Sequence, residues 1–136
     1  MKTVELAIAK KQLESLMGSE LGQLDPDAID ACIPDLRWES LPNDGLSDAK
    51  TATAIGRLGD TSISEFTFVT DASFAAGVGA FIVERSELWD FFALHVRDFK
   101  ERVFSGGDVI IWSRDSGKMW LCHHEGVFAT TTIIMP

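Results

Sequence analysis

The C-terminal third of the chain constrains the fold most, because three apolar stretches follow one another there with turn residues between them. Residues 108–113 and 118–123 are rich in Val, Ile, Trp and Leu, and residues 127–134 form a third such stretch. Asp115-Ser116-Gly117 is typical of a tight hairpin turn, and Glu125-Gly126 indicates a second turn. The pattern predicts an antiparallel meander of three strands.

Helical patterns occur on the N-terminal side of this meander. Apolar residues recur at helical spacing over residues 3–17, where Gly18 is the expected stop. A second helix is expected to start at Asp25-Pro26, since Asp is a good N-cap and Pro suits the first helical position. Ser86 is expected to cap a third helix, whose apolar stripe runs from Leu88 onward.

The remaining segments complete the prediction of the fold. Phe, Val and Thr predict strands over residues 63–70 and 79–84, with a turn or short irregular piece over 71–79. Residues 47–58 fit a helix or a strand equally well. We therefore expect one domain, residues 1–136, of the α+β class. It would have an antiparallel β-meander of about five strands with two to three helices packed against it.

Negative charge is concentrated in one segment. The whole chain carries a net charge of −9, and residues 12–49 hold nine acids and one base, Arg37, so this segment accounts for −8. Such a surface repels phosphate backbones and anionic lipids, so we expect no direct nucleic-acid binding and no membrane binding. A basic protein partner would be attracted to it. Many proteins are acidic simply for solubility, which is the other reading of this charge.

The sequence also favours a cytoplasmic location. No apolar stretch approaches the ~18 residues that a membrane span requires. Glu5 and Lys10-Lys11 interrupt the N-terminal apolar residues, so no signal peptide is predicted. Two cysteines are too few for a disulfide framework.

An aromatic residue among the acids suggests where a partner would bind. Trp38 stands between Asp35 and Glu39, and an aromatic anchor amid carboxylates favours a binding hot spot. Trp38 could equally be a lid over the core. The predicted partner-binding residues are Asp27, Asp30, Asp35, Trp38, Glu39 and Asp44. The leading hypothesis is a small acidic module, of the bacterial immunity or antitoxin type, that inhibits a basic toxin or nuclease by covering it.

The alternative hypothesis is a small enzyme or ligand-binding domain on the C-terminal hairpin. With a three-residue turn, Arg114 pairs with Lys118 and Trp112 lies opposite Trp120. The face would then carry the alternative ligand-binding residues Asp108, Trp112, Trp120, Cys122 and His124. A pair of tryptophans at this spacing is also common in a protein core. A four-residue turn would shift the register by one residue and remove this face.

No catalytic residue, metal site or cofactor is predicted. Adjacent residues on a strand point to opposite faces, so His123 and His124 are not expected to hold one ion. Cys122 lies between apolar neighbours and is expected to be buried and inert. We therefore favour a non-enzymatic role, and the sequence leaves the oligomeric state open.

Overall fold

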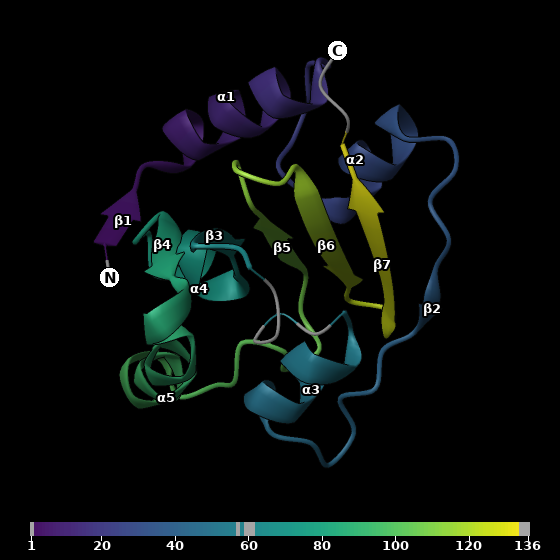
Figure 1. Cartoon of the computed structure of the whole chain (residues 1–136). Coiled ribbons are helices and arrows are strands. Elements are labelled where there is room, and N and C mark those ends of the chain that lie inside the picture. The colour runs from purple at the N-terminus through teal and green to yellow at the C-terminus, as the bar shows by residue number, and fades with distance from the viewer. Residues whose placement is uncertain (1, 57, 59–61, 134–136) are drawn as a thin grey trace.

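An antiparallel sheet runs through the molecule and contains the predicted meander (Figure 1). The computed structural model describes residues 2–56, 58 and 62–133. Seven strands lie in the order β1-β4-β3-β5-β6-β7-β2, and each neighbouring pair is antiparallel. The strands are β1 (Lys2–Val4), β2 (Glu39–Ser40), β3 (Glu65–Val69), β4 (Ala80–Glu84), β5 (Val109–Trp112), β6 (Lys118–His123) and β7 (Val127–Thr132). The predicted α+β class is confirmed, although about five strands were expected.

Helices lie on both faces of the sheet (Figure 1). They are α1 (Leu6–Met17), α2 (Pro26–Cys32), α3 (Asp48–Ala54), α4 (Asp71–Ala75) and α5 (Leu88–Phe99), with the 3-10 turn η2 (Arg85–Glu87) before α5. α1 and α2 bury Leu13 and Ile29 against one face, whereas α3 and α5 bury Ala52 and Phe91 against the other. None of these described helices is long and apolar enough to cross a membrane.

Local capping explains where several helices begin and end. Gly18 adopts a left-handed conformation, with φ 72°, and its N–H donates to the Glu14 carbonyl, which ends α1 as predicted. The Asp25 carboxylate accepts from the N–H of Ala28 at 2.8 Å, so the predicted start of α2 is also confirmed. The Ser47 hydroxyl accepts from the N–H of Lys50, which makes the start of the undecided segment 47–58 a helix.

Three predicted segments differ from the structure. Residues 2–4 form β1 against β4 instead of beginning a helix at residue 3. The segment predicted as a turn or irregular piece contains α4, because Thr70 and Ser73 form a reciprocal capping box at its start. Ser86 lies inside η2, so α5 begins only at Leu88.

The hairpin between β5 and β6 has a different register from the predicted one. Trp112 pairs with Met119 and Ile111 pairs with Trp120. The N–H of Ser113 donates to the Lys118 carbonyl at 2.9 Å, so four residues form the loop instead of three. Side chains alternate along a strand, and this shift of one residue places the two tryptophans on opposite faces.

The alternative hypothesis expected both tryptophans on one face of the hairpin, and this prediction is wrong. Trp112 is fully buried with Ile110 and Met119 in the core beneath α1 and α2. Trp120 is 1% exposed and packs with Cys122 in the core beneath α3 and α5. Both tryptophans fill the interior, which is the packing role that the sequence also allowed.

Candidate functional site

Polar side chains from three parts of the fold meet where β6 turns into β7. His123 is the last residue of β6, and His124 is the first residue of the turn that follows. Asp108 immediately precedes β5, and Asp27 lies in the first turn of α2. We call these four residues the histidine–aspartate cluster.

Each imidazole of the cluster is paired with one carboxylate. His123 Nε2 lies 3.0 Å from Asp27 Oδ1, and His124 Nδ1 lies 2.9 Å from Asp108 Oδ1. Asp108 Oδ1 also accepts from the backbone N–H of His124 at 2.8 Å. The two rings stack with their centroids 4.2 Å apart and an interplanar angle of 28°. Two imidazole–carboxylate pairs thus lie side by side.

Hydrogen bonds indicate which nitrogen of His123 carries the proton and which charge state of His124 is favoured. The N–H of Glu125 donates to His123 Nδ1 at 3.1 Å, so the proton of the neutral His123 ring is on Nε2 and faces Asp27. The side-chain hydrogen bond with Asp108 raises the pKa of His124 above its ordinary value. Asp108 therefore favours the charged form of this exposed imidazole.

The expectation that the two imidazoles point to opposite faces is wrong. It applied strand alternation to both residues, but His124 already lies in the turn, where alternation no longer holds. The sequence did carry a relevant signal, because Glu125-Gly126 places a turn directly after the histidines. Asp108 was named together with His124 in the alternative ligand-binding set, and the two side chains are in contact. The pairing of His123 with Asp27 could not be identified in this way, since these two residues are distant in sequence.

Trp38 connects this cluster to the acidic segment. Its indole N–H donates to Asp30 Oδ1 at 3.0 Å, and its ring meets the His123 ring edge-on, with centroids 6.1 Å apart. The side chain is half-buried and also packs against the core beneath α1 and α2. Trp38 therefore closes over the core and still presents part of its ring at the surface.

Four exposed carboxylates come from the elements on either side of Trp38. Asp27 and Asp30 come from α2, Asp35 from the connection that follows, and Glu39 from β2. Within the described ranges, none of these four carboxylates forms an ion pair with a Lys or Arg side chain. We call these four acids together with Trp38 the α2–β2 surface. It contains five of the six predicted partner-binding residues.

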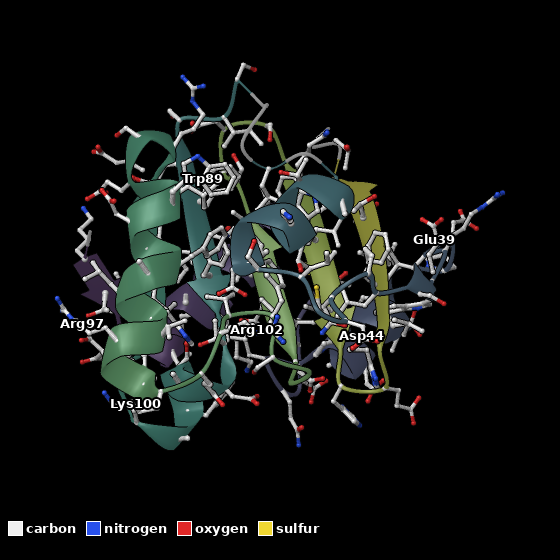
Figure 2. All side chains as sticks on the ribbon, turned by 90° about the horizontal axis from the view of Figure 1, so that it is seen from below. Glu39, Asp44, Trp89, Arg97, Lys100 and Arg102 are labelled. Carbon is white, nitrogen blue, oxygen red and sulfur yellow. The ribbon has the colours of Figure 1, made fainter. Side chains whose placement is uncertain are left out.

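The sixth predicted residue, Asp44, lies beyond this surface. It is exposed in the turn after β2, next to Asn43, whose side-chain amide donates to the Phe104 carbonyl at 2.9 Å. Arg102 donates to the carbonyl of nearby Leu46, and Figure 2 shows Arg102 on the same side as Asp44. Asp44 thus lies two residues before Leu46, whose carbonyl accepts from Arg102, and outside the α2–β2 surface.

Charges of both signs occur on both sides of the molecule. In Figure 2, Arg97 and Lys100 on α5 lie on one side and Glu39 on the other, but Arg97 is paired with Asp98, and Arg37 is exposed next to Trp38 in the chain. Several acids of the segment 12–49 also have internal roles. Glu14 lies 3.9 Å from Lys10, Asp25 caps α2, and Asp48 is buried. The docking surface expected from sequence is therefore smaller than the segment, but its remaining acids are open to solvent.

His95 and Cys122 also carry reactive side chains, but both are buried in the core. His95 is 2% exposed. Its Nδ1 lies 2.9 Å from the Glu101 carbonyl, and its Nε2 lies 3.0 Å from the Thr70 hydroxyl. Both ring nitrogens therefore have hydrogen-bond partners inside the core. Burial raises the pKa of the Cys122 thiol to about 12, which suppresses its nucleophilic thiolate form.

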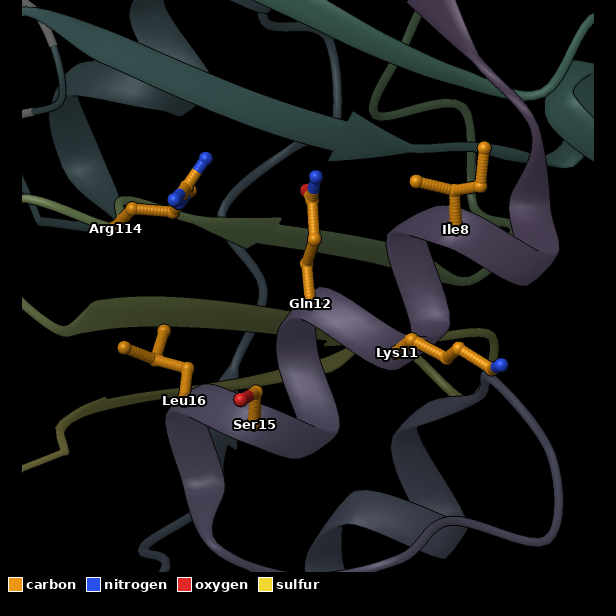
Figure 3. Close-up of a pocket in the computed structure, with 6 residues that line it drawn as sticks. All are labelled: Ile8, Lys11, Gln12, Ser15, Leu16 and Arg114. Atoms are coloured by element: carbon orange, nitrogen blue, oxygen red, sulfur yellow. The ribbon is translucent and has the colours of Figure 1, made fainter.

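A groove of about 540 Å³ separates α1 from the β5–β6 loop (Figure 3). Its lining residues are Ile8, Lys11, Gln12, Ser15, Leu16 and Arg114. This set includes two cations but no carboxylate, imidazole or thiol. The lining residues therefore offer no imidazole or carboxylate to activate the Ser15 hydroxyl.

The two thiols are expected to differ sharply in reactivity. Cys32 is partly exposed at the end of α2, whereas Cys122 is buried. With an aromatic disulfide reagent at pH 8, we expect one thiol to react in the folded protein and the second only after denaturant is added. The Cys32→Ser variant should show no rapid phase. A rapid reaction of Cys122 in that variant would contradict its burial in the core.

Comparison with protein-family models, with curated proteins and with solved structures finds no match to this chain. The function proposed for it therefore depends on the surface chemistry of the described residues.

Proposed function

We propose that the protein is a small acidic binding module of the bacterial immunity or antitoxin type, which inhibits a basic toxin or nuclease by covering it. The observation that carries the proposal is the α2–β2 surface, where four exposed carboxylates, none of them paired with a Lys or Arg side chain of the described residues, accompany a half-buried tryptophan. Exposed acids attract a basic protein over a distance of about 10 Å at ordinary salt.

The arrangement of Trp38 suits an anchoring role. Its Nε1 is held by Asp30 and its ring edge by His123, so the side chain is ordered before a partner arrives. A pre-ordered aromatic residue loses little conformational freedom on binding. Carboxylates around such an anchor would provide steering and orientation, while the aromatic ring would supply buried apolar area.

The first experiment identifies the partner and then tests the mechanism. The full chain is immobilised and used to capture proteins from a lysate of its own source. A captured basic protein is then purified for kinetic measurements and co-expressed with the chain. We expect co-expression to relieve the growth defect that the partner causes on its own. The association rate constant should fall steeply as salt is raised.

Charge reversal tests whether the α2–β2 surface is responsible. The double variant Asp35→Lys/Glu39→Lys is expected to slow association at least about tenfold, because both carboxylates are exposed and belong to this surface. The matched control is Glu5→Lys/Asp90→Lys, which changes the net charge equally at exposed positions elsewhere in the fold. An equal loss in both variants, or in neither, would show that this surface does not dock the partner.

A further inference from the structure

We propose that Asp108, His123 and His124 form a binding site for a divalent transition-metal ion, with Zn²⁺ as the best-suited ion. One ligand atom from each of these three residues lies within 4.8 Å of the other two. The inference concerns the isolated chain and does not depend on a protein partner.

The donor atoms of the site come from positions that the fold holds together. The turn after β6 brings His124 beside His123, and the two rings stack at 4.2 Å. Asp108 is fixed next to His124 by two contacts, one to the backbone N–H at 2.8 Å and one to Nδ1 at 2.9 Å. An ion would thus meet a partly assembled set of ligands instead of three independent side chains.

The chemistry of the donors selects the class of ion. Two imidazole nitrogens and one carboxylate oxygen are the donor types of Zn²⁺, Co²⁺ and Ni²⁺ sites. Ca²⁺ and Mg²⁺ prefer sets made of oxygen alone. Neutral imidazoles add no charge, so the carboxylates of Asp108 and the neighbouring Asp27 would together balance a divalent cation.

Binding of the ion requires the ligand atoms of the three residues to move slightly closer together. Zinc bonds of about 2.0–2.2 Å place neighbouring donors about 3.4 Å apart in a tetrahedral site. The side chains of His124 and Asp108 are 57% and 34% exposed, so both can rotate without disturbing the core. His123 is only 10% exposed and provides the fixed side of the site.

Asp27 would orient the His123 ring for the ion. Its side chain is 77% exposed and lies 3.0 Å from His123 Nε2, which carries the proton of the neutral ring. Carboxylates orient metal-binding histidines through such a hydrogen bond. The ion would then bind His123 Nδ1, in place of the hydrogen bond that this atom accepts from the Glu125 N–H. An ion in this site would thus link α2 to the end of β6 through His123.

The test uses the full chain without a polyhistidine tag, after treatment with a chelator that is then removed. Isothermal titration with ZnCl₂ is expected to give one ion per chain with a dissociation constant of about 10 µM or tighter. Added Co²⁺ should produce the visible absorption bands of a cobalt ion with nitrogen and oxygen ligands. Zn²⁺ should also raise the melting temperature, since the ion binds the folded state.

His124→Ala is the decisive variant, because this exposed side chain can be removed without opening the core. We expect its affinity for Zn²⁺ to fall at least about tenfold, while its circular dichroism spectrum stays unchanged. Asp90→Asn, at an exposed position on α5, is the matched control and should bind as the parent does. No binding up to about 1 mM Zn²⁺, or equal binding by His124→Ala, would overturn the proposal.

Discussion

Replacing Trp120 by Ala should lower the free energy of unfolding by about 3–5 kcal/mol, the range for removing a large aromatic side chain from a core. Trp120 is 1% exposed and its ring centroid lies 5.9 Å from that of Phe66. A Cβ atom on Gly56 would come within 2.5 Å of Trp120 Nε1, so the indole packs directly against that backbone. Because the free energy of unfolding of a whole domain is only about 5–15 kcal/mol, this one substitution removes a large share of it.

Chemical denaturation followed by circular dichroism measures this loss. The matched control is Trp89→Ala on α5, because Trp89 is 49% exposed, although its ring centroid lies 5.7 Å from that of Phe92. We expect the control to cost less than about 1 kcal/mol. Equal costs for the two variants would show that Trp120 does not lie in the interior.

The second large loss of stability is expected on replacing Asp48, an acid whose carboxylate is buried in the fold. Its two carboxylate oxygens accept from the backbone N–H groups of Val103 and Phe104, at 2.8 and 3.0 Å. Asp48 is 5% exposed, so replacing it by Ala leaves both buried N–H groups without an acceptor. We expect Asp48→Ala to lower the free energy of unfolding by about 2–4 kcal/mol.

Two comparisons separate this role from a general effect of charge. Asp48→Asn keeps one oxygen acceptor and should cost less than Asp48→Ala. Asp44→Ala removes an exposed carboxylate four residues upstream and should change stability by less than about 0.5 kcal/mol. If Asp48→Ala were as mild as Asp44→Ala, the two hydrogen bonds would contribute nothing to holding α3 against the segment after α5.

Features determined by neighbouring residues could be predicted from the sequence. Asp25 caps α2 through an N–H three residues away, and Gly18 ends α1 by its own left-handed conformation. The strands of the meander were also recognisable, because long apolar stretches alternate there with turns. Short elements were missed: β1 has three residues and β2 has two, too few to establish a period.

Features determined by distant residues could not be predicted. The loop after β5 is stabilised by the residue that follows β7, because the N–H of Ile133 donates to the carbonyl of Gly117 at 2.7 Å. The sequence of the loop alone therefore did not reveal its length, and the register was wrong by one residue. His123 and Asp27 are 96 positions apart, and only the completed fold brings them together. Trp38, the neighbouring acids and the pair of Asp108 with His124 were named from the sequence, whereas the contact of His123 with Asp27 was not.

The strand order also determines when the chain can fold during translation. The five inner strands all come from residues 65–132, whereas the two outermost strands, β1 and β2, come from the first forty residues. The N-terminal portion leaves the ribosome first and has no inner strand to pair with until much later. The last inner strand, β7, is also the strand that β2 requires. The newly made acidic segment therefore stays solvated and unpaired along β2 until residues 127–132 have been synthesised.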